Sequence, residues 1–75
     1  MKARVLEIVS NVLNVPVDRV SEDSSPDTIK EWDSLMHMNL VLTLEEEFGV
    51  HFSDEQIMEM LSVGQIIRTV LELVP

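Results

Sequence analysis

Ser34 is the side chain in this sequence that is best placed for chemistry. It follows Asp33 and a long polar stretch, and an apolar-patterned segment from Leu35 to Phe48 that predicts a helix comes directly after it. The first backbone N–H groups of a helix are unpaired and carry partial positive charge, so a phosphate on or near Ser34 would be stabilised there. This position therefore suits a phosphoester.

No base accompanies this serine. A serine hydroxyl is a weak nucleophile unless a base activates it, and the two histidines are His37, close in sequence, and His51, at the far end of the same segment. Because no triad, oxyanion loop or metal set is evident, we expect no catalytic residue and no enzymatic activity. A plain alternative is that Ser34 or Asp33 only caps the helix, since both residue types are common N-caps.

The acidic loop before Ser34 has part of the spacing of a calcium-binding loop. Asp23, Ser25 and Asp27 alternate as in an EF-hand loop. However, Thr28 stands where that loop needs glycine, and Ser34 stands where it needs a bidentate glutamate. We therefore expect a solvated turn and no metal site.

Composition limits the class of protein and its partners. Residues 1–75 are expected to form one domain, and 45% hydrophobic residues are enough for a small helical core. There is no cysteine, so any thiol chemistry would need an imported thiol. The net charge of −9 disfavours nucleic acid and anionic lipid and favours basic protein surfaces. With no apolar run that could span a bilayer, we expect a cytoplasmic monomer with no nucleic-acid or membrane partner.

Apolar periodicity and capping residues define the elements that position Ser34. The expected helices run over Lys2 to Asn14, Ser34 to Phe48, Asp54 to Met60 and Val63 to Val74. Gly49 supplies a left-handed C-cap, while Ser53 with Gln56 and Ser62 with Gln65 have the spacing of capping boxes. The expected fold is all-α: a four-helix bundle with a long loop between helices 1 and 2 and a short third helix.

The loop from Pro16 to Trp32 is long for so small a chain. Its few apolar residues, Val17, Val20 and Ile29, are expected to pack it onto the core, and Trp32 is expected to anchor its end. A connector of this length lets the second helix run in a direction that a short turn would forbid.

Asp33-Ser34-Leu35, with a following helix that ends in Leu44-Glu45-Glu46-Glu47-Phe48-Gly49-Val50, resembles the acyl carrier protein family. The resemblance extends over the whole chain in element order. It implies a 4′-phosphopantetheine arm on Ser34, attached from coenzyme A by a phosphopantetheinyl transferase. The thiol of the arm would carry acyl intermediates as thioesters, in fatty-acid, polyketide or specialised biosynthesis, and deliver them to partner enzymes. An aminoacyl or peptidyl carrier, or an unmodified acidic interaction module in which Ser34 is only a cap, are the alternatives.

The resemblance also implies a partner surface on the second helix for acyl-loading and acyl-transferring enzymes with basic docking patches. Its expected members are Asp33, Leu35, Met36, Met38, Asn39, Leu42, Glu45 and Glu46. Met36 and Asn39 stand where the family usually has acids, which makes the surface more apolar. The sequence Trp-Asp-Ser-Leu, with Trp32 in place of a small residue, is similar to carriers of specialised pathways.

Three further expectations concern single side chains on this surface. Among the methionines, Met36 is expected to be exposed, and His37 is expected to be a solvent-exposed helix residue. The consecutive acids Glu45, Glu46 and Glu47 lie at the negative end of the helix dipole, which lowers local stability, and the sequence shows no structural partner for them. Two interpretations stay open: a solvated face or an interaction surface.

Overall fold

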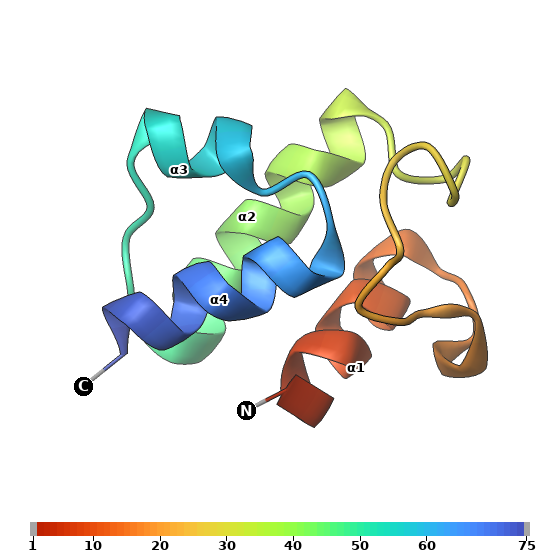
Figure 1. Ribbon diagram of the computed structural model, residues 1–75, viewed down its shortest axis with the longest axis horizontal. Coiled ribbons are helices and arrows are strands. Elements are labelled where there is room, and N and C mark those ends of the chain that lie inside the picture. Colours follow the sequence, from red (N-terminus) through yellow and green to blue (C-terminus); the bar gives the residue numbers. More distant parts are fainter. Residues whose placement is uncertain (1, 75) are drawn as a thin grey trace.

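All regular secondary structure is helical over the part that the structure describes, residues 2–74 of a computed structural model. The elements are α1 (Lys2–Leu13), the 3₁₀-helix η1 (Val17–Arg19), α2 (Ser34–Phe48), α3 (Asp54–Glu59) and α4 (Val63–Leu73). Figure 1 shows the long connector between α1 and α2 at one end of the molecule and the last turn of α4 at the other. The predicted all-α fold with a long first loop and a short third helix is confirmed.

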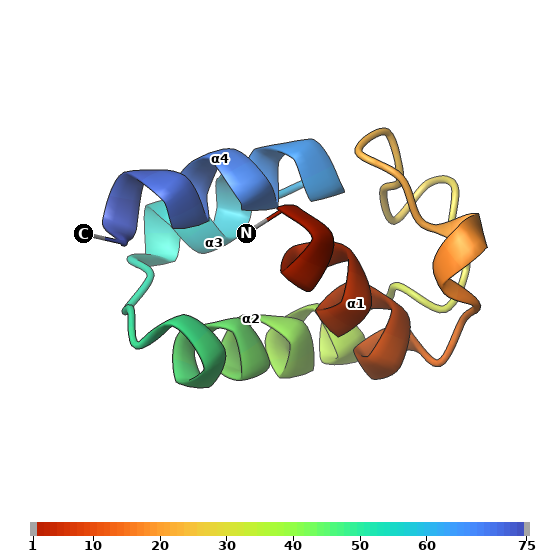
Figure 2. The same ribbon diagram turned by 90° about the horizontal axis from the view of Figure 1, so that it is seen from below.

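The core lies between α1, α2 and α4. In Figure 2, α2 and α4 form two layers with α1 between them, and α1 contacts both. Each of these helices turns one apolar face inward. The core side chains include Val5, Ile8 and Val9 of α1, Leu40, Val41 and Leu44 of α2, and Val63, Ile66, Ile67 and Val70 of α4. All four helices are therefore ordered around the same cluster, to which the α3 flank adds Met60.

Helix α2 carries more apolar residues than it buries. Only Leu40, Val41 and Leu44 are buried, although the helix is apolar over much of its circumference. The side chains of Leu35, Met38 and Leu42 keep 67%, 45% and 56% of their area exposed. This surplus apolar surface lies on the helix that begins at Ser34.

The connector is fixed onto the start of α4. The backbone N–H groups of Val63 and Gly64 donate to the carbonyls of Ser24 and Glu22, both at 2.9 Å. These donors belong to the first turn of α4, where no intrahelical partner is available. A Cβ at Gly64 would lie 3.2 Å from the Glu22 carbonyl oxygen, so glycine permits this close approach.

The apolar anchors of the connector are Val20, Ile29 and Trp32, which are all buried. The prediction was wrong for Val17, which is 52% exposed. Val17 opens η1, and this short turn of helix was not predicted. The result is a connector that is held at both α4 and the core, and that delivers the chain to the start of α2.

Most helix ends follow the predicted caps. Gly49 has the left-handed conformation, with φ 64°, and Ser53 and Gln56 form a complete capping box. At α4 the second box is only half formed. The Ser62 hydroxyl accepts from the Gln65 N–H at 3.2 Å, but the Gln65 side chain accepts from the N–H of Leu61 rather than that of Ser62. The prediction of a full box there was wrong.

The remaining helix ends differ by one residue from the predicted bounds. Asn14 follows α1 in the left-handed region, at φ 56°, and so ends the helix before Pro16 is reached. Met60 and Val74 are C-caps of α3 and α4 rather than their last helical residues.

Candidate functional site

Asp33, and not Ser34, is the N-cap of α2. Its backbone is extended, and its Oδ1 accepts a hydrogen bond from the Met36 N–H at 2.9 Å. The Asp33 carbonyl accepts the first intrahelical bond, from the His37 N–H at 2.8 Å. The alternative in which Ser34 is the helix cap is therefore wrong, because its neighbour already fills that role.

Ser34 is the first residue inside the helix, and its side chain is exposed. Within residues 2–74, its hydroxyl takes part in none of the side-chain hydrogen bonds. The first-turn N–H groups that Asp33 leaves unpaired lie beside it, at the positive end of the helix dipole. The hydroxyl is thus free, accessible and placed where a phosphate is stabilised.

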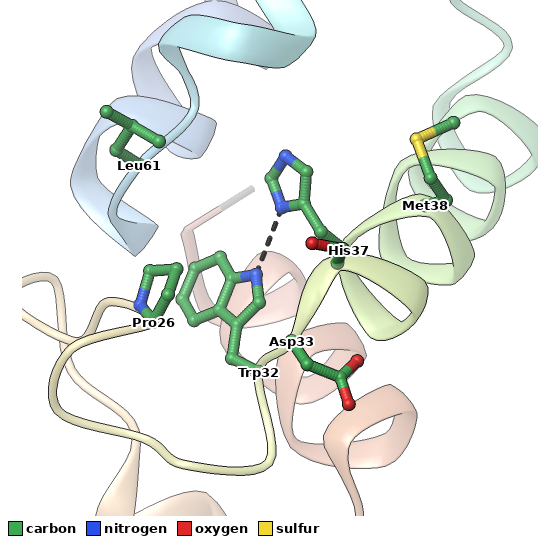
Figure 3. A pocket seen from close by; sticks show the side chains of 7 residues that line it. Pro26, Trp32, Asp33, His37, Met38 and Leu61 are labelled. Carbon is green, nitrogen blue, oxygen red and sulfur yellow. Dashed lines mark hydrogen bonds between the residues drawn. The ribbon is translucent and has the colours of Figure 1, made fainter.

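Trp32 and His37, which line one pocket together with Ser34, form a hydrogen-bonded pair (Figure 3). The indole Nε1–H of Trp32 donates to His37 Nδ1 at 3.0 Å, and the two rings stack with centroids 6.1 Å apart. Because an indole can only donate, His37 Nδ1 must be unprotonated, so the ring proton is on Nε2. That proton points to the Ile57 carbonyl of α3, 3.1 Å away.

His37 consequently joins three segments: the connector, α2 and α3. The prediction that it is simply exposed was wrong, because the ring is half-buried between Trp32 and Ile57. Both ring nitrogens are occupied, so His37 has no lone pair to accept a proton from Ser34. An aromatic donor five residues before a histidine hints at this pair, but nothing in the sequence connects His37 with Ile57.

A pocket of about 490 Å³ opens beside Ser34. Its lining residues are Pro26, Trp32, Asp33, Ser34, His37, Met38 and Leu61. They come from the connector, from the first turns of α2 and from the link between α3 and α4 (Figure 3). Sequence reasoning did not place Pro26 and Leu61 near Ser34, since they are distant in sequence and meet only through the fold.

The residues predicted for partner binding divide into two groups. Six of them are exposed: Asp33, Leu35, Met38, Asn39, Leu42 and Glu46. The other two, Met36 and Glu45, are half-buried. Met36 packs against the core, so the prediction that it is the exposed methionine was wrong; Met38 and Met58 are exposed instead, at 45% and 74%.

The acidic end of α2 has structural partners that the sequence did not reveal. Glu45 Oε2 accepts from the Phe52 N–H at 2.8 Å and lies 3.2 Å from His51 Nδ1, which fixes the link after Gly49. Glu47 Oε1 accepts from Arg4 Nη2 at 2.7 Å. These contacts correct the expectation that the glutamates bring no structural return.

The Arg4 contact also shifts the ionisation of its partner. The hydrogen bond from Arg4 lowers the pKa of Glu47 below its ordinary value. By the same hydrogen bond, Glu47 raises the pKa of Arg4. Both groups are therefore charged at neutral pH, and the pair ties the end of α2 to the start of α1.

Residues 2–74 also bear on metal binding and on membrane insertion. No group of three or more His, Asp or Glu side chains in this range could hold a metal ion. None of its helices combines the length and apolar character needed to cross a bilayer.

The fold is a small helical bundle with an exposed serine at the start of its second helix. Residues 3–70 match the family model described as "Phosphopantetheine attachment site". The chain is also similar to a holo acyl carrier protein from Geobacter metallireducens, with a TM-score of 0.85, 25% identity, and coverage of 95% of this chain and 82% of that one. The chain belongs to the acyl carrier protein family, and it functions as a carrier that uses a covalent 4′-phosphopantetheine arm.

Proposed function

We propose that Ser34 is the residue that receives the phosphopantetheine arm, and that the arm carries acyl groups as thioesters to partner enzymes. The observation that carries the proposal is the division of roles at the start of α2. Asp33 binds the Met36 N–H and caps the helix, so the exposed Ser34 hydroxyl has no structural task. A phosphodiester at this position would also benefit from the helix dipole.

The residues present fit the arm in charge and in chemistry. The positive end of α2 faces the oxygen that would carry the phosphate. The chain has no cysteine, and the bound arm supplies the thiol on which the acyl group is held. We include a cytoplasmic location in the proposal, because a reducing compartment keeps such a thiol free.

The chain acts as a substrate of the loading reaction rather than as its catalyst. A bond forms between Ser34 Oγ and the phosphorus of coenzyme A that bears the pantetheine, and the bond from that phosphorus to the nucleotide part breaks. The serine proton must pass to a base of the transferase, since both ring nitrogens of His37 are already hydrogen-bonded. In this proposal the protein is not an enzyme.

The partner enzymes are proposed to dock on the exposed face of α2. Leu35, Met38 and Leu42 present apolar area there, and Asp33 and Glu46 add negative charge. With a net charge of −9, the chain favours partners that combine a basic patch with an apolar one. Asn39 belongs to this surface as a polar contact.

Two residues of the predicted partner surface have structural contacts within the fold. Glu45 holds the Phe52 N–H and Met36 packs on the core, so we propose that they position the docking helix rather than form its centre. We further propose that residues 1–75 act as one domain and as a monomer, because all four helices pack on one core cluster.

Intact mass spectrometry tests the attachment. The purified protein is incubated with coenzyme A and a broad-specificity phosphopantetheinyl transferase, alongside Ser34→Ala and the matched control Ser53→Ala. The wild type and Ser53→Ala are expected to gain one phosphopantetheinyl group, and Ser34→Ala is expected to gain none. A folded Ser34→Ala variant that still gains the group would refute the assignment.

A further inference from the structure

The pocket beside Ser34 has the residue proposed to carry the arm in its own wall. Pro26 and Trp32 of the connector form one side, and Leu61 of the link between α3 and α4 closes the other (Figure 3). Any group attached to Ser34 Oγ therefore starts at the edge of this pocket. Its proximal atoms are the ones that can enter without the arm turning back on itself.

The ring nitrogens around the pocket, and one carboxylate oxygen, are already committed to other partners. The Trp32 indole N–H binds His37, and the second ring nitrogen of His37 binds the Ile57 carbonyl. Asp33 Oδ1 is used by the helix cap. Besides the second carboxylate oxygen of Asp33, what remains for a ligand is apolar: the Pro26 ring, the side chains of Met38 and Leu61, and the small accessible part of Trp32, which is 2% exposed.

Two of these apolar side chains are exposed when the pocket is empty. Met38 keeps 45% of its area accessible and Leu61 keeps 58%. Covering exposed apolar surface stabilises a complex, so a compact apolar group would be favoured here. An anionic group would not, since Asp33 brings a carboxylate to the same wall.

We propose that this pocket binds the proximal, branched section of the phosphopantetheine arm, namely the carbon with two methyl groups that follows the phosphate. The inference rests on the proposed attachment at Ser34. The phosphate stays outside, at the positive end of α2, and the two methyl groups pack between Trp32 and Leu61. The acyl group at the thiol end lies too far along the arm to be the first occupant.

This placement has a consequence for docking. The arm leaves Ser34 toward the connector and Leu61, so it does not lie across Leu35 and Leu42, which are absent from the pocket lining. The exposed face of α2 remains open to a partner while the arm is held. His37 acts as a positioning residue, because its hydrogen bond fixes the Trp32 ring that forms one wall.

Nuclear magnetic resonance of the modified protein tests the proposal. Conversion is first verified by intact mass, and contacts are then measured between the two methyl groups of the arm and the side chains of Trp32 and Leu61. The chain has one tryptophan, so its indole N–H resonance is an unambiguous reporter. We expect methyl contacts to both residues and a shift of the indole resonance on modification.

Two variants provide the matched comparison. Leu61→Ser removes the far wall, whereas Leu71→Ser changes a leucine of similar exposure, 54%, that does not line the pocket. The methyl contacts to Trp32 should be lost in Leu61→Ser and kept in Leu71→Ser, with both folds checked by thermal melting. If Leu61→Ser does not fold, the wild-type contacts alone decide.

The outcomes separate this inference from the function on which it rests. A protein that gains the arm but shows no methyl contact with Trp32 or Leu61 overturns the inference and leaves the carrier assignment intact. Loss of the contacts in both leucine variants also overturns it. A protein that gains no arm refutes the attachment at Ser34, and the inference falls with it.

Discussion

The starts of α2, α3 and α4 all contain serine, and the comparison shows what is special about Ser34. At α3 and α4 the serine is the N-cap, and its hydroxyl accepts a backbone N–H, in Ser53 from Gln56 and in Ser62 from Gln65. At α2 the cap is Asp33, and Ser34 follows it as the first helical residue. One residue type thus has a structural task at two helix starts and none at the third.

The difference shows that a reactive position can be created by assigning the local structural work to a neighbour. A carboxylate at the N-cap satisfies the helix as well as a hydroxyl does. The hydroxyl next to it then keeps its exposure and its freedom to rotate. Modification at Ser34 costs the helix nothing, whereas the same modification at Ser53 would remove a cap.

The largest predicted difference is between two alanine variants, one at Ser34 and one at the helix cap Ser53. Ser34→Ala should lose all modification and keep its free energy of unfolding within about 0.5 kcal/mol of the wild type, because the Ser34 hydroxyl makes no side-chain hydrogen bond within residues 2–74. Ser53→Ala should keep modification and lose about 1 kcal/mol of stability. Urea unfolding and intact mass, measured on the same samples, check both statements.

A second prediction concerns the pair beside the site. His37→Ala leaves the indole N–H of Trp32 buried without an acceptor, which should destabilise the fold by about 1–3 kcal/mol. His37→Gln can still accept from the indole and donate to Ile57, so it should recover part of the loss. Urea unfolding followed by Trp32 fluorescence measures these differences.

The other histidine is the control for this experiment. The side chain of His51 is 91% exposed, and its one ion-pair partner within residues 2–74 is Glu45, whose Oε2 lies 3.2 Å from His51 Nδ1. His51→Ala should therefore change stability far less than His37→Ala does. Equal losses in the two variants would mean that the Trp32 pair adds nothing to the fold.

A third prediction concerns Asp33, the N-cap of α2. Asp33→Ala removes the acceptor of the Met36 N–H and should destabilise the protein by about 1 kcal/mol. Asp33→Asn keeps an acceptor oxygen and should lose less, which circular dichroism melts can resolve. An Asp33→Ala variant as stable as the wild type would show that Ser34 can take over the cap.

The smallest predicted effect is a pH dependence at the other end of α2. The hydrogen bond from Arg4 depresses the pKa of Glu47, so its contribution to stability is present above the unfolded-state pKa and is lost as pH falls through the folded-state pKa. Glu47→Gln should therefore lose stability at neutral pH and show a shallower decline in acid. Glu46→Gln, beside it and without an ion pair in residues 2–74, should keep the wild-type decline in thermal melts from neutral to acidic pH.

The sequence was most informative where structure depends on neighbours in the chain. The extent of α2, the left-handed Gly49 and the Ser53 capping box were all predicted, because each is decided within a few residues. Asp33 and Ser34 were both recognised as possible caps, but only the structure distinguishes them, since the choice depends on backbone angles that both residue types can adopt.

The parts that could not be predicted depend on distant contacts. The half-buried position of His37 was not predicted, because its hydrogen-bond partner Ile57 is 20 residues away in the sequence. The structural contacts of Glu45 and Glu47 were not predicted, because only the fold brings Phe52 and Arg4 close to them. The pocket beside Ser34 likewise requires Pro26 and Leu61 from two separate links. The periodicity of apolar residues along the chain carries no information about contacts between residues that are distant in sequence.

Peptide mapping would show directly whether the free hydroxyl of Ser34 is the attachment point. The modified wild-type protein is digested and fragmented by tandem mass spectrometry, so that the arm is assigned to one of the serines in the chain. We expect the arm to be found on Ser34 alone. An arm on Ser53, Ser62 or a serine of the connector would contradict it.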